Sequence, residues 1–278
     1  MSIEKVALVT GSNRGIGYTL VQHLARKFKG IVYLTARSDE IGHKAVEDLA
    51  KEGLKANYHQ LDIDNTESIK RCVEYIKNKH GGLDLLVNNA AIAYKVNDET
   101  PFKVQAENTL RINFFSTLNV SNEFFKILRP HARVLNVSSR AGVLTWLADA
   151  DIIAKLSSEK TNIDDIVKIA NDFVEAARNG TYEKISKSAY GMSKACLNAL
   201  TEVQQRRFNK DSRADLVVNG ACPGYTSTGM TSFKGHSTEE AVVTLLHLAT
   251  LPENTDVKGE FWAEMKPYDW KTAKFSIS

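Results

Sequence analysis

Short runs of apolar residues, many of them β-branched, alternate along the chain with segments in which apolar residues recur every three or four positions. The short runs cover residues 6–10, 31–36, 85–88, 134–137 and 216–219, with a weaker candidate at 56–61. Such runs are typical of strands buried on both faces, and the spacing of Ile16, Leu20, Leu24 and Phe28 is typical of an amphipathic helix. The repeated strand–helix–strand pattern predicts an α/β fold with a doubly wound parallel sheet.

One long segment interrupts this alternation. Residues 143–186 lie between the fifth predicted strand and a helix that is expected to begin near Ala189. Apolar residues with helical spacing occur within it: Ile163, Ile166, Val167, Ala170, Phe173, Val174 and Ala177. The segment is therefore predicted to be a helical insertion. Because the chain has no repeat and no Pro/Gly/Ser-rich linker, residues 1–278 are expected to form a single domain.

Composition narrows the class of protein. The 36 basic and 33 acidic residues are spread along the chain, so the net charge of +3 gives no argument for nucleic-acid binding. No apolar stretch approaches the roughly 18 residues of a membrane span, and the N-terminus lacks the pattern of a signal peptide. The three cysteines are far apart and the seven histidines lack paired-ligand spacing, so neither disulfides nor a metal site is expected. We expect a cytoplasmic protein with no membrane or nucleic-acid partner.

A glycine-rich turn follows the first predicted strand and leads directly into a helix. Glycines at such a turn let the backbone approach a pyrophosphate, whose charge then lies at the helix N-terminus. The turn predicts a dinucleotide site that includes Gly11, Asn13, Arg14, Gly15, Ile16 and Gly17.

A tyrosine and a lysine lie four positions apart at the start of another predicted helix. Tyr190 and Lys194 therefore share one face of that helix. A free tyrosine has a pKa of about 10, but a cation about 4–5 Å away would favour the phenolate by roughly 3–4 kcal/mol, or two to three pKa units. We expect Tyr190 to be able to donate a proton to a developing alkoxide near physiological pH.

Polar residues follow two further strands. Asn88-Asn89-Ala90-Ala91 ends the fourth strand, and Asn136-Val137-Ser138-Ser139-Arg140-Ala141-Gly142 ends the fifth, with Asn113 in the helical stretch between them. The carboxyl ends of parallel strands are where ligand sites of open sheets form. These segments are therefore expected to join the glycine turn in one site.

The order of these motifs, followed by Pro223-Gly224, resembles the short-chain dehydrogenase/reductase family across essentially the whole chain. The resemblance implies a Rossmann-like doubly wound sheet, with the insertion placed before the Tyr190 helix. Residues 88–102, 113–117, the insertion and residues 222–225 are similar to the monomeric NADPH-dependent carbonyl reductases within that family.

The resemblance also implies roles for single residues. Ser139 would be the catalytic serine, and it is preferred over Ser138 because it stands three residues before the glycine of the S-x-x-G pattern. Tyr190 would be the proton donor and Lys194 would bind the ribose. Asn113 would hold a proton-relay water. Further cofactor contacts are implied for Asp62, Ile63, Asn89, Ala90, Tyr190, Lys194, Pro223, Gly224, Thr226 and Thr228. Ala91 replaces the glycine of most relatives, a change expected to matter little.

The charge near the second strand indicates the choice of cofactor. Folds selective for NAD usually place an acid after this strand to bind the ribose diol. Here the strand is followed by Arg37, and the first acid is Asp39. Arg37 and Arg14 would instead pair with a 2′-phosphate, which predicts NADPH/NADP.

The predicted activity is NADPH-dependent reduction of ketones, aldehydes or quinones, with loops 93–100, 143–146 and 226–236 around a small-molecule substrate. An alcohol or hydroxysteroid dehydrogenase using NAD(P) remains an alternative, as does a non-catalytic NADP(H)-sensing protein. The apolar face of the insertion is expected to cover the helices through which many relatives associate, which predicts a monomer.

Overall fold

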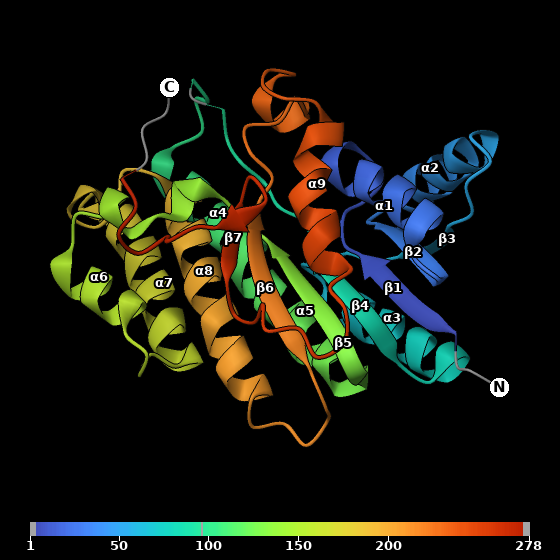
Figure 1. Cartoon of the computed structure of the whole chain (residues 1–278). Coiled ribbons are helices and arrows are strands. Elements are labelled where there is room, and N and C mark those ends of the chain that lie inside the picture. Colours follow the sequence, from blue (N-terminus) through green and yellow to red (C-terminus); the bar gives the residue numbers. More distant parts are fainter. Residues whose placement is uncertain (1–3, 96, 275–278) are drawn as a thin grey trace.

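The computed structural model describes residues 4–95 and 97–274; the parts of the predicted domain and of loop 93–100 outside these ranges are not described. One sheet runs through the molecule in the order β3-β2-β1-β4-β5-β6-β7-β8 (Figure 1). Its strands are β1 (Lys5–Val9), β2 (Gly30–Ala36), β3 (Asn57–Gln60), β4 (Leu83–Asn88), β5 (Leu128–Val137), β6 (Val217–Cys222), β7 (Phe261–Ala263) and β8 (Lys266–Pro267). All neighbouring strands pair in parallel except β7 and β8. The predicted doubly wound fold is confirmed.

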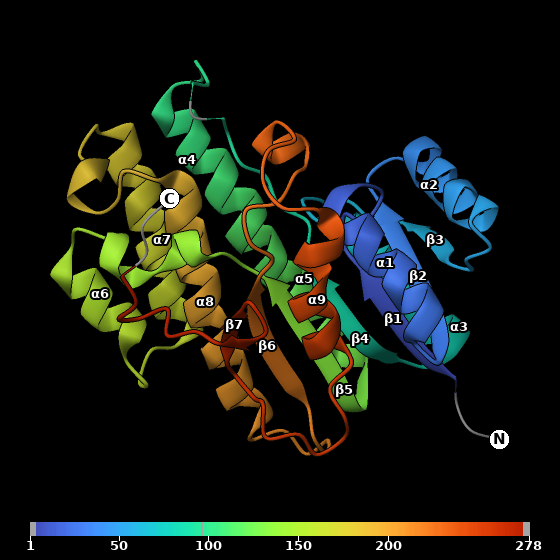
Figure 2. The ribbon, with the colours of Figure 1, turned by 45° about the horizontal axis from the view of Figure 1, so that its top comes forward.

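Helices cover both faces of the sheet (Figure 2). They are α1 (Gly15–Lys27), α2 (Asp39–Lys51), α3 (Thr66–His80), α4 (Phe102–Leu110), α5 (Thr117–Phe124), α6 (Ala150–Ser157), α7 (Ile163–Arg178), α8 (Ala189–Phe208) and α9 (Thr238–Ala249). The apolar residues of α1, α2 and α9 pack on one face of the strands, and those of α3 and α5 pack on the other. None of the helices in the described ranges is both long enough and apolar enough to cross a membrane.

The insertion adds an outer layer beside α4 and α8. The α7 helix begins with a capping box in which the Asn162 side chain accepts the Asp165 N–H and the Asp165 carboxylate accepts the Asn162 N–H. Its buried face, including Ile166 and Phe173, shares one apolar cluster with residues of α4 and α8. The helical insertion predicted from the sequence is therefore confirmed.

Parts of the sheet extend beyond the predicted strands. The β5 strand begins at Leu128, whereas the predicted strand began at residue 134. The prediction began too late because a polar stretch that includes His131, with φ 64°, interrupts the apolar pattern. The β6 strand continues to Cys222 through the buried but small Gly220 and Ala221. The β7 and β8 strands were not predicted, since two or three residues are too few to establish a period.

Candidate active site

The site forms where the connections of the sheet change direction, between β1 and β4. From β1 the chain passes to β2 and β3 on one side, whereas β4 leads to β5, β6 and β7 on the other. The carboxyl ends of β1 and β4 are adjacent, with Val9 aligned with Val87. Doubly wound sheets bind their ligands in the crevice at this point.

The glycine turn after β1 is packed closely against the segments around it. Gly11 and Gly15 have φ angles of +58° and +57°, which favour glycine. A Cβ added to Gly17 would lie 2.5 Å from Nδ2 of Asn89, and a Cβ added to Gly11 would lie 2.8 Å from the Cβ of Ala90. A Cβ added to Gly15 would touch the side chain of Thr228. The predicted cofactor residues of three segments thus meet, and this bare backbone at the start of α1 fits a dinucleotide pyrophosphate.

Thr10 ties the carboxyl end of β1 to that of β4. Its Oγ1 accepts the N–H groups of Asn89 at 2.9 Å and Ala90 at 3.0 Å. The Asn89 Nδ2 donates in return to the carbonyl of Thr10 at 2.9 Å and to that of Gly11 at 3.1 Å. Thr10 is therefore a positioning residue that the sequence analysis did not single out, although it opens the glycine turn.

Arg14 and Arg37 lie on two neighbouring loops, and both side chains are exposed. Hydrogen bonds join the loops: the Ser12 N–H donates to the Thr35 carbonyl at 2.9 Å, and the Thr35 N–H donates to Ser12 Oγ at 3.0 Å. Arg37 also lines an open cavity of about 680 Å³, together with Asp39 and other residues. This placement fits a 2′-phosphate between the two arginines.

The remaining predicted cofactor residues differ in their exposure. Asp62 is half-buried two residues after β3. The side chain of Ile63 packs in the apolar core, so only the backbone of Ile63 can face a ligand. Thr226 is buried, and its hydroxyl donates to the carbonyls of Pro223 and Gly224 at 3.3 and 3.1 Å. These two bonds fix the turn at the start of the loop after β6. In the described part of the chain, no group of three or more metal-ligating side chains could hold an ion.

Three of the predicted catalytic residues meet between β5 and α8. Ser188 caps α8 by accepting the Gly191 N–H at 2.9 Å, which fixes the helix just before Tyr190. The Ser139 side chain lies beside the Tyr190 phenol, close enough to lower the pKa of that phenol. Lys194 Nζ lies 5.6 Å from the centroid of the Tyr190 ring. These contacts bring a serine, a tyrosine and a lysine together.

Ser138 and Ser139 differ in their surroundings. Ser138 is 2% exposed, and its hydroxyl donates to Oδ1 of Asn198 at 2.5 Å. Asn198 in turn donates to the carbonyl of Gly142 at 3.3 Å. Ser138 and Asn198 therefore hold α8 against the end of β5, while Ser139 faces Tyr190.

The pKa values of the tyrosine and the lysine are controlled by burial, which corrects the expectation that Lys194 would lower the pKa of Tyr190. Burial raises the pKa of the Tyr190 phenol, as does the neighbouring Cys222, while the Ser139 hydroxyl acts in the opposite direction. Burial also lowers the pKa of Lys194 to about 8. The ammonium donates at 2.8 Å to the carbonyl of Val137 rather than to the phenol. Tyr190 therefore keeps its proton at neutral pH.

Asn113 lies in a short π-helical turn, Arg111–Ser116, between α4 and α5. Its Oδ1 accepts the Ile92 N–H at 2.8 Å, and its Nδ2 donates to the Ile92 carbonyl at 2.9 Å and to Ser193 Oγ at 3.1 Å. The Ser193 hydroxyl then donates to the carbonyl of Tyr190 at 2.7 Å. The side chain thus joins the loop after β4 to α8 through Ser193, a residue that the sequence analysis missed, and its binding of a relay water stays a prediction.

Comparison with known proteins identifies the family. A model of the short chain dehydrogenase family matches residues 5–150. The chain is 41% identical to carbonyl reductase (NADPH) 1 of Rattus norvegicus, over 97% of this chain and 99% of the relative. It is 40% identical to carbonyl reductase (NADPH) 1 of Homo sapiens, over 95% of this chain and 98% of the relative. Its fold is similar to salutaridine reductase from Papaver somniferum, with a TM-score of 0.85, 27% identity, and coverage of 93% of this chain and 99% of that one. The chain therefore belongs to the short-chain dehydrogenase family.

Proposed function

We propose that the protein reduces carbonyl compounds to alcohols with NADPH, and that Tyr190 protonates the oxygen of the substrate. The observation that carries the proposal is the placement of Ser139 and Tyr190 side by side, beside Lys194 and next to a turn that fits a dinucleotide. The names of relatives that are 40–41% identical, all carbonyl reductases with NADPH, support it.

The cofactor would be held by the glycine turn, by the two arginines and by Lys194. Arg14 and Arg37 would pair with the 2′-phosphate, and Lys194 would donate to the ribose hydroxyls. When bound, NADPH supplies the hydride. The protein supplies position and charge around the carbonyl group.

The two hydroxyl groups act on the carbonyl oxygen. Ser139 and Tyr190 donate hydrogen bonds to it, and these strengthen as negative charge develops on the oxygen. The Tyr190 proton then passes to the alkoxide. An alkoxide is about as basic as hydroxide, whose parent water has a pKa of about 15.7, so the transfer is favourable even from a phenol whose pKa is raised.

The direction of the pKa shift favours reduction over alcohol oxidation. Oxidation needs the Tyr190 phenolate as a base, and burial disfavours that form. The non-catalytic alternative is disfavoured because Asn113, Ser139, Tyr190 and Lys194 occupy all four catalytic positions.

We expect the protein to oxidise NADPH in the presence of ketones, aldehydes or quinones, and the rate to fall as the pH rises through about 8. Lys194 is charged below its pKa and neutral above it, so its bonds to the ribose hydroxyls weaken at alkaline pH. Tyr190 keeps its proton over the same range, because its pKa is raised. Loss of NADPH absorbance, measured for a panel of carbonyl compounds over a pH series, provides the test.

The reverse reaction and the second cofactor are the controls. Alcohol oxidation with NADP should be slow at neutral pH and should accelerate with pH, since it uses the phenolate. Faster oxidation with NAD than reduction with NADPH would favour the alcohol dehydrogenase alternative. Tight NADPH binding without turnover of any carbonyl compound would favour the sensing protein.

The packing of the insertion supports a monomer as part of the proposal. The α7 helix buries Ile166, Phe173 and their neighbours against α4 and α8, the helices expected to pair in oligomeric relatives. Arg178 at the end of α7 also lies 3.3 Å from Glu107 of α4. An intramolecular helix avoids the entropy that a partner subunit would lose on association. We also place the protein in the cytoplasm, because its cysteines, Cys72, Cys196 and Cys222, are free.

Light scattering or sedimentation at micromolar concentration is expected to give a mass near 30.9 kDa. The reason is that α7 already covers the surface that a second subunit would need. A stable mass of two or four times this value would contradict the prediction and would mean that the insertion leaves the association surface open.

A further inference from the structure

Arg140 and Glu264 form an ion pair beside the catalytic residues. Arg140 follows Ser139 directly in the chain, and its Nη1 lies 2.6 Å from Oε1 of Glu264 in the turn between β7 and β8. Because β6 lies between β5 and β7, the pair crosses the carboxyl end of β6, where Cys222 is the last residue. Cys222 lies near enough to Tyr190 to raise the pKa of its phenol. The guanidinium is therefore held at the edge of the site where the carbonyl oxygen would bind.

The two members of the pair differ in their exposure to water. The side chain of Arg140 is 24% exposed, whereas that of Glu264 is 61% exposed. A guanidinium removed from water needs an anion, and its planar fork matches a carboxylate. The carboxylate of Glu264 is already largely hydrated, so it can leave the pair with little loss, as exposed ion pairs contribute little. A second carboxylate could therefore replace it.

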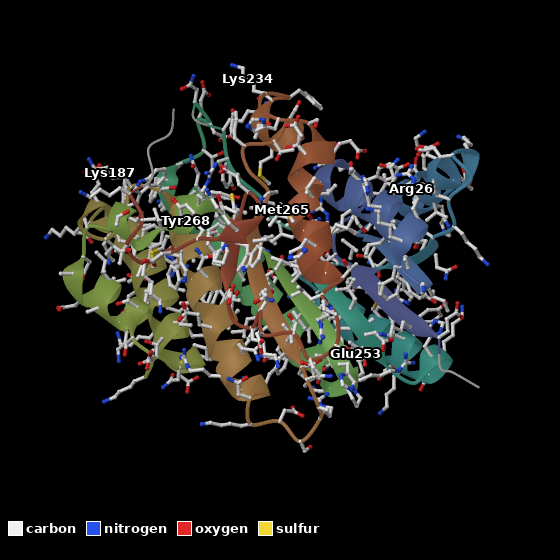
Figure 3. All side chains as sticks on the ribbon, viewed as in Figure 1. Arg26, Lys187, Lys234, Glu253, Met265 and Tyr268 are labelled. Atoms are coloured by element: carbon white, nitrogen blue, oxygen red, sulfur yellow. The ribbon has the colours of Figure 1, made fainter. Side chains whose placement is uncertain are left out.

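Two lysines near the catalytic residues are less suited than Arg140 to bind an anionic substrate. Lys194 is buried and donates to the Val137 carbonyl, and the cofactor ribose is its proposed ligand. Lys187, just before α8, is 78% exposed and lies 3.8 Å from Glu183. In Figure 3, Lys187 lies well away from Met265, the residue that follows Glu264. Lys187 is thus a cation near the same helix, but at a different place.

Resting on the proposed function, we infer that Arg140 determines substrate specificity by binding the carboxylate of an oxo acid, a compound that carries both the reacting carbonyl and an anionic group. Glu264 occupies this position until the substrate carboxylate displaces it. Ser139 and Arg140 are consecutive, but the backbone at Ser139 is extended, so their side chains leave it in different directions. An oxo acid whose chain is long enough to bridge the two can therefore place its carbonyl against Ser139 and Tyr190. The substrate class is therefore the oxo acids.

The test compares oxo acids of increasing chain length with their methyl esters, using the full chain and NADPH. The measured quantity is the ratio of kcat/KM for an acid to kcat/KM for its ester. If replacing Arg140 disturbs the neighbouring Ser139, both substrates are slowed alike and the ratio does not change. Arg140→Met should lower this ratio at least tenfold for the best acid. Glu264→Gln should raise it several-fold, because the competing carboxylate is lost. Lys187→Met, the matched control, should leave it unchanged.

Each outcome decides the inference. A wild-type ratio below one for every chain length, or a ratio that Arg140→Met does not change, would overturn it. A fall of the same size in Lys187→Met would also overturn it, because the effect would then come from general charge. If Arg140→Met does not fold, the rise in Glu264→Gln still tests the inference. Reduction of esters without preference for acids refutes this inference alone, whereas failure to reduce either compound refutes the proposed function.

Discussion

Replacing Tyr190 with phenylalanine should lower kcat for carbonyl reduction at least about a hundredfold, the scale of general acid catalysis. The substitution keeps the ring, which packs beside Lys194, and removes only the hydroxyl that lies beside Ser139. Without the phenol, the alkoxide must take its proton from water. Steady-state rates of wild type and variant with one ketone, at saturating NADPH, provide the measurement.

Two controls separate chemistry from binding and folding. The affinity for NADPH, measured by fluorescence titration, should change little, because the phenol is a small part of the cofactor site. Tyr182→Phe is a matched substitution in the insertion, where the ring stacks on Phe102 with centroids 3.8 Å apart. It should keep near-normal turnover. A Tyr190→Phe variant with near-normal kcat would mean that another group is the acid.

The local parts of the site could be predicted from the sequence because each is a short motif in a defined context. The glycine turn lies between a strand and a helix, and the spacing of Tyr190 and Lys194 places them on one helical face. The strand ends also share one edge of a parallel sheet. These regularities are properties of the backbone, so motif and spacing were sufficient to predict them.

The parts that were missed depend on contacts between distant segments. Thr10 bonds to Ala90, and Ser193 bonds to Asn113. In both pairs the two residues are 80 positions apart in the sequence. The pKa of Tyr190 was wrongly expected to fall, because spacing along a helix gives the neighbour but not the burial. Burial is a property of the whole fold, and no local pattern contains it.

The preference for NADPH over NADH should fall by roughly 2–4 kcal/mol, or about 30- to 700-fold, when Arg37 is replaced by aspartate. The substitution would remove the proposed charge-assisted pair with the 2′-phosphate and put a carboxylate in its place. Arg14 on the neighbouring loop would still favour the phosphate, whereas the new carboxylate would repel it. The kcat/KM values for the two cofactors should therefore become similar, or the value for NADH should become the higher one. The readout is kcat/KM for NADPH and NADH with the same carbonyl compound.

Arg26→Asp makes the same change of charge at a different place and serves as the matched control. Arg26 lies in the last turn of α1, is 46% exposed and is 3.6 Å from Glu52 (Figure 3). The helix begins at the glycine turn, so its last turn is remote from the phosphate site. If the preference changed equally in both variants, the cause would be the net charge of the protein. An unchanged preference in Arg37→Asp would mean that the 2′-phosphate is bound elsewhere, whereas a loss confined to Arg37→Asp requires the phosphate to lie against that guanidinium.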